Sequence, residues 1–280
     1  MKNLINTEDL HNRLGEEDLR IVDTRFALSA TEAGREAYEY AHIPGAVYFD
    51  LDKDLSSPPQ KHGGRHPLPD MQAFADTLAA TGISNSSKVV VYDESSGVVG
   101  GRLWWMLRYV GHRAVQVLDG GFTGWLAADY PTDAAVPSPD QGIFTLDLQA
   151  DMLANMDHVR RKLEDPTTRL IDARGRDRFR GENETMDPKA GHIPGAINLP
   201  YTENLAEGHY KSVEDLSAQV ADLELEGADE IIVYCGSGVS AAHNLIALEE
   251  IGIEGAKLYI GSWSDWSSYP HNPVATGEET

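Results

Sequence analysis

The residues best suited to covalent chemistry surround Cys235, the one cysteine of the chain. Four β-favouring residues, 231–234, come directly before it, and the apolar spacing from Ser240 to Glu250 predicts a helix after it. Between them lies a short bend that contains Gly236, Ser237 and Gly238. The sequence therefore places a single thiol at the point where a strand meets a helix.

A bend of this kind favours the thiolate form of a cysteine. Its successive backbone N–H groups can point into one concavity, and the positive end of the following helix dipole lies behind it. Gly236 and Gly238 leave that concavity open because they carry no side chains. The thiolate is the nucleophilic form, so the stretch predicts a reactive Cys235. The alternative is an inert, buried cysteine, which is common in proteins.

Composition restricts the classes of protein and partner. The chain has 280 residues, 41% of them hydrophobic and 24% charged, which is typical of a folded protein with room for two domains. Its net charge of −22 argues against nucleic acid or an anionic membrane as a partner. One cysteine excludes a disulfide framework and a multi-cysteine metal site. The first residues contain no export signal, so we expect a cytoplasmic protein.

The chain repeats itself, which indicates a tandem duplication. Four short segments of the first half return in the second half in the same order and at similar spacing. The pairs are 21–25 with 170–174, 41–47 with 191–197, 89–93 with 231–235, and 120–125 with 261–266. In this alignment Asp93 occupies the position of Cys235. Because a carboxylate cannot replace the soft thiolate, we expect catalysis only in the second half.

Each half alternates short apolar strands with longer amphipathic stretches, which predicts an α/β fold with a mainly parallel sheet flanked by helices. In the second half we expect helices over 213–223 and 240–251 and strands over 231–234 and 257–259. The proline-rich stretch between the halves is typical of a linker. The predicted organisation is a non-catalytic domain over 1–132, a linker over 133–150 and a catalytic domain over 151–280.

The cysteine loop and the duplication resemble the rhodanese-like sulfurtransferases. The run from Cys235 to Val239 is similar to the active-site loop of the 3-mercaptopyruvate branch, and Ser240 stands where that family usually has threonine. The resemblance covers nearly the whole chain and includes the His-Ile-Pro-Gly-Ala segments of both halves. It implies two tandem rhodanese-like domains, of which only the second is active.

The resemblance also implies a group of residues that serve the cysteine. Residues 48–69 form a long irregular connection, and such loops are often functional. In the mercaptopyruvate branch the corresponding loop supplies an aspartate and a histidine that pair with the serine of the cysteine loop. Matching the motifs gives these roles to Asp52, His66 and Ser237, with His62 as a rival for the histidine.

Recognition of the substrate requires positive charge and an open cradle. Arg178 matches the first of two substrate-binding arginines in the mercaptopyruvate branch, and its guanidinium suits a carboxylate or sulfonate. The second arginine is missing, and Lys189 is a candidate to replace it. The resemblance assigns the remaining substrate contacts to loop residues, which are Gly236, Gly238, Val239 and Ser240.

These residues together predict a sulfurtransferase. Cys235 would take a sulfane sulfur from an anionic donor, 3-mercaptopyruvate in preference, and pass it as a persulfide to a thiol such as thioredoxin or to cyanide. No cofactor or metal is expected, because the cysteine carries the sulfur itself. Three alternatives remain: a thiosulfate sulfurtransferase, a non-catalytic sulfur carrier or regulatory module, and a phosphatase. The phosphatase is disfavoured because residues 235–242 contain no arginine.

We predict that Cys235→Ser abolishes sulfur transfer and leaves the fold intact, because a serine hydroxyl is neither ionised nor soft enough to attack sulfur. Intact-mass spectrometry after treatment with donor should show about one added sulfur atom on the wild type and none on the variant. Turnover by the serine variant would refute the assignment of the nucleophile.

Overall fold

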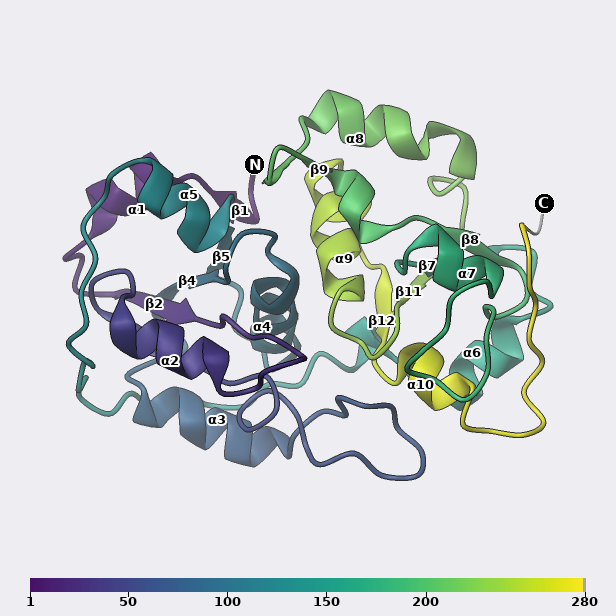
Figure 1. The fold of residues 1–280 in the computed structure, drawn as a ribbon, viewed down its shortest axis with the longest axis horizontal. Helices are drawn as coiled ribbons and strands as arrows, with labels where there is room; N and C mark the ends of the chain where they lie inside the picture. The colour runs from purple at the N-terminus through teal and green to yellow at the C-terminus, as the bar shows by residue number, and fades with distance from the viewer. Residues whose placement is uncertain (279–280) are drawn as a thin grey trace. The chain divides into compact units, whose positions relative to one another are not determined.

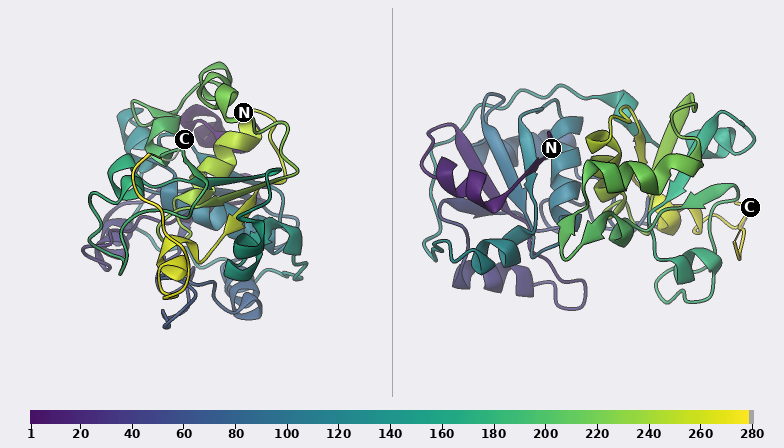
Figure 2. Two further views of the ribbon diagram at one scale, coloured as in Figure 1. Left: turned by 90° about the vertical axis from the view of Figure 1, so that its right-hand side faces the viewer. Right: turned by 90° about the horizontal axis from the view of Figure 1, so that it is seen from above.

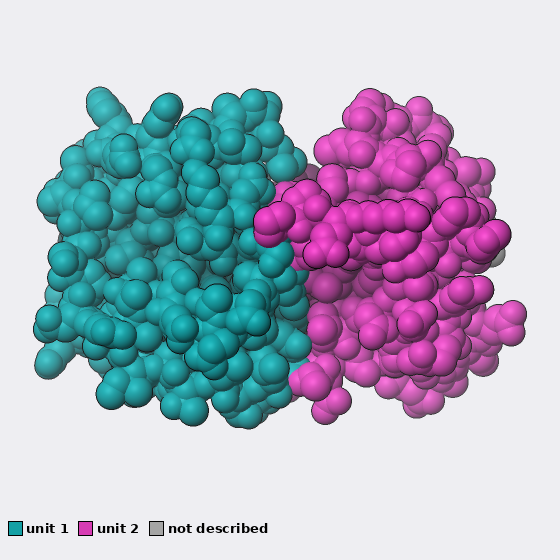
Figure 3. Space-filling view, turned by 90° about the horizontal axis from the view of Figure 1, so that it is seen from below, with its two compact units in different colours: residues 1–57, 68–149, 207–210 teal, residues 58–67, 150–206, 211–280 magenta. Residues whose placement is uncertain are grey.

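The computed structural model describes residues 1–278, which form two compact units. Figure 3 colours them separately. Unit 1 contains residues 1–57, 68–149 and 207–210, and unit 2 contains residues 58–67, 150–206 and those from 211 onward. The segment 58–67 thus belongs to unit 2, although it lies in the first half of the sequence. The domain boundaries given above remain a proposal.

Unit 1 is built on a five-stranded parallel sheet in the order β1-β5-β4-β2-β3 (Figure 1). Its strands are β1 (Leu4–Ile5), β2 (Leu19–Asp23), β3 (Ala46–Tyr48), β4 (Lys88–Tyr92) and β5 (Val115–Leu118). Its helices are α1 (Thr7–Arg13), α2 (Ala33–Tyr40), α3 (Met71–Ala80), α4 (Val98–Tyr109) and α5 (Gly121–Ala127), and the two-residue strand β10 is His209–Tyr210.

Unit 2 repeats this topology, with a parallel sheet in the order β6-β12-β11-β7-β8. Figure 2 shows the ribbon from two further sides. Its strands are β6 (Leu153–Ala154), β7 (Thr168–Asp172), β8 (Ala196–Asn198), β9 (Leu205–Ala206), β11 (Glu230–Tyr234) and β12 (Lys257–Tyr259). Its α-helices are α6 (Met156–Lys162), α7 (Arg176–Arg180), α8 (Val213–Val220), α9 (Ala241–Glu250) and α10 (Ser262–Trp266). Short 3₁₀ turns occupy Ala150–Met152, Tyr201–Asn204 and Ala221–Leu223.

The predicted fold class is confirmed, because both sheets are parallel and flanked by helices. The continuous apolar run of β11 is buried, as expected for a central strand that is covered on both faces. The helix predicted over 213–223 ends earlier, at Val220, and continues as a 3₁₀ turn. Among residues 1–278, no helix has the length and apolar character needed to cross a membrane.

The same buried ion pair ends the second strand of each repeat. In unit 1 the Arg25 guanidinium lies 2.7 Å from the Asp23 carboxylate, and in unit 2 Arg174 lies 2.6 Å from Asp172. All four side chains are at most 5% exposed. Each arginine also donates to a backbone carbonyl that precedes a His-Ile-Pro-Gly turn. The repeated Asp-x-Arg motif therefore holds that turn to the sheet in each unit.

In unit 1 the loop equivalent to the cysteine loop is closed by its own carboxylate. Asp93 is buried, and its two carboxylate oxygens accept the backbone N–H groups of four residues. The donors are Gly97 at 2.8 Å, Val99 at 2.9 Å, Ser95 at 3.2 Å and Gly100 at 3.3 Å. The N–H groups that could bind an external anion are therefore occupied by Asp93.

We predict that Asp93→Asn destabilises the protein by about 2 kcal/mol, because a neutral amide replaces a carboxylate that accepts several buried hydrogen bonds. Urea titration measures the loss, and the exposed neighbour provides the control Glu94→Gln. The sulfur transfer expected of unit 2 should change little. A large loss of turnover at unchanged stability would show that unit 1 takes part in the chemistry.

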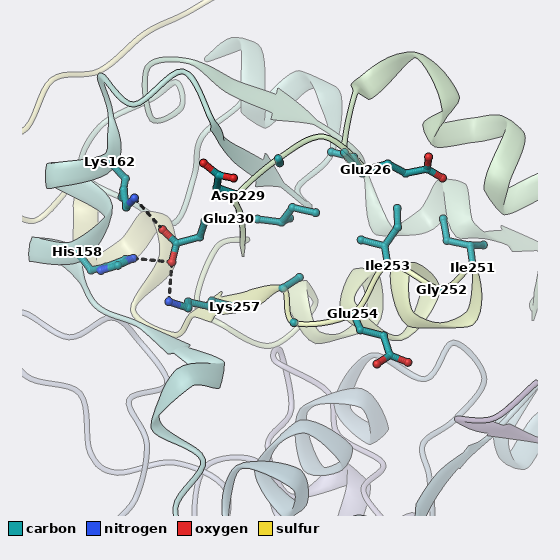
Figure 4. Close-up of a pocket in the computed structure, with 15 residues that line it drawn as sticks. His158, Lys162, Glu226, Asp229, Glu230, Ile251, Gly252, Ile253, Glu254 and Lys257 are labelled. Carbon is teal, nitrogen blue, oxygen red and sulfur yellow. Dashed lines mark hydrogen bonds and ion pairs between the residues drawn. The ribbon is translucent and has the colours of Figure 1, made fainter.

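A cavity of about 710 Å³ lies at the amino end of β11 in unit 2 (Figure 4). Three basic side chains surround the Glu230 carboxylate there: Lys257 at 2.6 Å, His158 at 2.8 Å and Lys162 at 3.5 Å. Burial alone would raise the pKa of Glu230, but the hydrogen bonds from Lys257 and His158 outweigh it and lower that pKa below the ordinary 4.5. This cluster ties α6 and β12 to the start of β11.

We predict that Glu230 contributes to the loss of stability in acid. Because its pKa is lower in the folded protein, its contribution is complete above the unfolded value of 4.5 and disappears as the pH falls through the folded value. The melting temperature of Glu230→Gln should therefore be lower than wild type at pH 7 and approach it in acid. Glu226→Gln, in the same cavity, is the control; an equal gap at both pH values contradicts the prediction.

Candidate active site

Cys235 follows the carboxyl end of β11 and precedes α9, as the sequence predicted. The residue is 1% exposed. Its sulfur accepts the backbone N–H of Gly238 at 3.2 Å, so the loop does direct a backbone donor at the thiol. The hydroxyl of Ser262 lies 3.9 Å from the same sulfur. The Gly238 N–H is therefore the donor that the loop directs at the sulfur, since the Ser262 hydroxyl donates to the Tyr259 carbonyl.

Helix α10 holds the cysteine loop in place. The N–H groups of Trp263 and Ser264 donate to the carbonyls of Cys235 and Gly236, at 3.0 and 2.9 Å. The Ser262 hydroxyl accepts the Cys235 N–H at 3.1 Å and donates to the Tyr259 carbonyl at 2.9 Å. Ser262 has φ +56°, which is unfavourable for a non-glycine residue and is often found at functional sites. Cys235 is therefore fixed through its backbone.

The two glycines of the loop, Gly236 and Gly238, are needed for different structural reasons. Gly238 has φ +76°, and a Cβ at this position would lie 2.1 Å from the Ile260 carbonyl oxygen, so the loop excludes any side chain there. A Cβ on Gly236 would instead point at two guanidinium groups, 3.0 Å from Nη2 of Arg65 and 3.2 Å from Nη1 of Arg178. Gly236 thus keeps open the space between these cations and the loop.

Val239 and Ser240 lead directly into α9. Val239 is buried, with 8% of its surface exposed, and Ser240 is half-buried at the residue before the helix begins. Their carbonyls accept the N–H groups of Ala242 and His243, which continues the loop into the helix. Their predicted contacts with substrate remain predictions.

Of the two candidate histidines, His66 is the one that contacts the serine of the cysteine loop. His66 Nδ1 lies 2.8 Å from the Ser237 hydroxyl, and both residues are buried. His62 Nδ1 lies 2.7 Å from the Ser268 hydroxyl, and its ring stacks on Tyr269 with centroids 4.0 Å apart. All five residues belong to unit 2. The geometry therefore favours His66 as the partner of Ser237.

Two arginines face the cysteine loop, and two acidic residues hold them there. Arg178 donates from Nε and Nη2 to Glu184, at 2.8 to 3.1 Å, and from Nη2 to Asp187 at 3.1 Å. Arg65 donates from Nη1 to the other oxygen of Asp187. Burial would raise the pKa of Glu184, but the Met186 N–H and Arg178 outweigh it and lower that pKa, so this carboxylate stays ionised. The nitrogens that face Gly236, Arg65 Nη2 and Arg178 Nη1, are the ones that these acids do not use.

Lys189, the candidate for the second cation, has another task. Its amine donates to the carbonyls of Tyr269, Pro270 and Asn272, at 2.8, 3.3 and 3.4 Å. It therefore fastens the chain after α10. The second guanidinium beside Gly236 is that of Arg65, which the sequence analysis did not name as a site residue. The available signal was its position directly before His66 in the loop expected to reach the site.

Asp52, the third residue of the predicted relay, belongs to unit 1. It is exposed, and its N–H donates to the Asp50 carboxylate at 2.9 Å. Partial desolvation by its surroundings and the nearby charge of Asp50 raise the pKa of Asp52. Its partnership with His66 remains a prediction.

The arrangement within unit 2 can perform nucleophilic chemistry on a small anion. It combines a thiol that accepts a backbone N–H, two guanidinium groups beside the adjacent Gly236, and a histidine–serine pair one residue further along the loop. The cations can bind a carboxylate or sulfonate, and the histidine–serine pair can supply a proton to a leaving group.

Comparison with known proteins shows the family of the chain. The rhodanese-like domain model matches residues 6–128 and 155–269. The "Probable 3-mercaptopyruvate sulfurtransferase" of Pseudomonas aeruginosa is 43% identical over 280 residues, 98% of each chain. The thiosulfate sulfurtransferase of Mus musculus is 34% identical over 276 residues, 95% of this chain and 91% of that one.

Among solved structures, the chain is similar to SseA, a 3-mercaptopyruvate sulfotransferase from Escherichia coli. The TM-score is 0.82 at 32% identity, and the match covers 94% of this chain and 100% of SseA.

Proposed function

Because this chain belongs to the family of rhodanese-like domain proteins, we propose that it is a sulfurtransferase whose preferred donor is 3-mercaptopyruvate. A sulfane sulfur passes from the donor to Cys235 and then, as a persulfide, to an acceptor. The second rhodanese-like domain carries the chemistry, and the first is non-catalytic. The observation that carries the choice of donor is the 2.8 Å contact between His66 and Ser237 beside the cysteine loop.

The donor step needs a proton, and this contact can provide it. The Cys235 thiolate attacks the sulfur of mercaptopyruvate, and a sulfur–sulfur bond forms as the carbon–sulfur bond breaks. The electron pair of the broken bond stays on carbon, which leaves the enolate of pyruvate. Ser237 donates a proton to that carbon, and His66 restores the serine hydroxyl. Asp52 is proposed as the residue that supports His66.

The donor carboxylate is bound by Arg178 and Arg65. Their nitrogens that face Gly236 lie next to the nucleophile, and guanidinium groups suit planar carboxylates. Backbone and side-chain atoms of Gly236, Gly238, Val239 and Ser240 line the cradle that receives the transferred sulfur. The fixed loop allows this cradle to form before the substrate arrives.

Thiosulfate is the second candidate donor, since the same two guanidinium groups suit a sulfonate. In that reaction the thiolate takes the outer sulfur and sulfite leaves without needing a proton. For the acceptor we propose a thiol, such as that of thioredoxin, or cyanide. A reducing compartment such as the cytoplasm suits a site that depends on a free thiol.

We predict that His66→Ala and Ser237→Ala lower kcat/KM for mercaptopyruvate by about 10²- to 10⁴-fold, and lower that for thiosulfate much less. The reason is the leaving group: an enolate must be protonated, whereas sulfite is stable as it leaves. Both donors are measured on one preparation of each variant. The matched control is His62→Ala, because His62 contacts Ser268 instead of Ser237.

Three outcomes would count against the proposal. Equal losses with both donors would make the histidine–serine pair positional. A selective loss in His62→Ala would reassign the histidine. A wild type with higher kcat/KM for thiosulfate than for mercaptopyruvate would favour the thiosulfate enzyme.

A further inference from the structure

Residues 62–66 contain Arg65 and His66 of the site. This segment is attached to α10 and to the turn that follows it. The Gly63 N–H donates to Asp265 Oδ1 at 2.7 Å, and the Arg65 N–H donates to the Ser264 hydroxyl at 3.1 Å. His62 adds its contact with Ser268. The same helix holds the cysteine loop through Trp263 and Ser264, so one short element contacts both halves of the site.

Asp265 is built into the unit as a fixed acceptor. It is 5% exposed, and its second oxygen, Oδ2, accepts the Tyr259 hydroxyl at 2.7 Å. Burial and the charge of Asp265 raise the pKa of Tyr259 well above 10, so this hydroxyl keeps its proton and continues to donate. The Tyr259 hydroxyl of β12 thus holds one oxygen of the Asp265 carboxylate, and the other oxygen, Oδ1, accepts the Gly63 N–H.

Gly64 brings the segment into direct contact with α10. It has φ +87°, and a Cβ there would lie 2.5 Å from the Gly261 carbonyl oxygen and 3.0 Å from the Ser264 hydroxyl. Gly63 has a similar φ of +98°, but the atom nearest to a Cβ added there would be in the Pro67 side chain, 4.0 Å away. The two glycines therefore share a backbone conformation and differ in their distance from the helix.

We propose that α10 is the docking platform that places Arg65 and His66 against the Cys235 loop, with Asp265 and Ser264 as positioning residues. The proposal rests on the function proposed above. Neither residue needs to touch the substrate. Each acts through a backbone N–H of the segment and so sets the distance from the guanidinium and imidazole to the nucleophile.

The first test compares Gly64→Ala with Gly63→Ala. Both substitutions add the same strain at positive φ, but only alanine at 64 pushes the segment away from α10. We expect Gly64→Ala to lower kcat/KM for mercaptopyruvate by about 10- to 100-fold more than Gly63→Ala, because small misplacements of catalytic groups are costly. Equal losses in the two variants would overturn the proposal.

A double-mutant cycle separates positioning from general damage. If Gly64→Ala acts by displacing Arg65 and His66, then its effect on kcat/KM should be much smaller in a background that carries both Arg65→Ala and His66→Ala. Additive effects would overturn the proposal. The rate of the triple variant is read in single turnover, as sulfur gained by Cys235.

A second pair of variants decides the matter if Gly64→Ala does not fold. Asp265→Ala removes the acceptor for Gly63, whereas Tyr259→Phe removes only the other hydrogen bond of the same carboxylate. We expect Asp265→Ala to have a lower kcat/KM than Tyr259→Phe, although the two variants have similar melting temperatures. An unchanged kcat/KM in Tyr259→Phe agrees with the proposal. An equal loss of kcat/KM in both variants would overturn it. If the wild type takes no sulfur from either donor, the proposed function fails instead.

Discussion

Two backbone hydrogen bonds between α10 and the cysteine loop are the constraint on which the site depends. They join the N–H groups of Trp263 and Ser264 to the carbonyls of Cys235 and Gly236. A parallel sheet ends its strands at one edge and leaves the following loops without ladder partners. Because α10 supplies two such partners, the loop after β11 is held in place without ladder hydrogen bonds.

Unit 1 has the same constraint without a cysteine. Phe122 and Thr123 of unit 1 donate to the carbonyls of Asp93 and Glu94 at 2.9 and 2.8 Å, in the same pattern. The first residue of the corresponding helix, α5 in unit 1 and α10 in unit 2, has φ +56° in both units. It is Gly121 in unit 1 and Ser262 in unit 2. The backbone scaffold is therefore shared. What separates the units is the side chain placed on it. In unit 1 the Asp93 carboxylate accepts several N–H groups of the loop, and in unit 2 the Cys235 sulfur accepts the Gly238 N–H.

The sequence was sufficient wherever a local pattern decided the structure. The apolar run before Cys235 and the helical spacing after it define β11 and α9, and the internal repeat predicts two similar sheets. It was insufficient where distant residues compete for one partner. Lys189 and Arg65 are both cations near the expected place, and nothing local indicates that carbonyls after α10 take the lysine. Likewise, the anchoring of 62–66 depends on hydrogen bonds across some two hundred positions of the chain, which no periodicity reveals.

The charge of the site also follows from such distant pairings. A chain with a net charge of −22 repels anions at long range, so an anionic donor must be attracted locally. Arg65 and Arg178 would lose that capacity if the neighbouring acids neutralised them from every side. Asp187 is 2% exposed and sits between the two guanidinium groups, engaging Nη1 of one and Nη2 of the other. The acids therefore fix the orientation of both cations and leave the nitrogens beside Gly236 turned toward the cysteine loop. Under the proposed function, the orientation of the two charges decides recognition more than their number does.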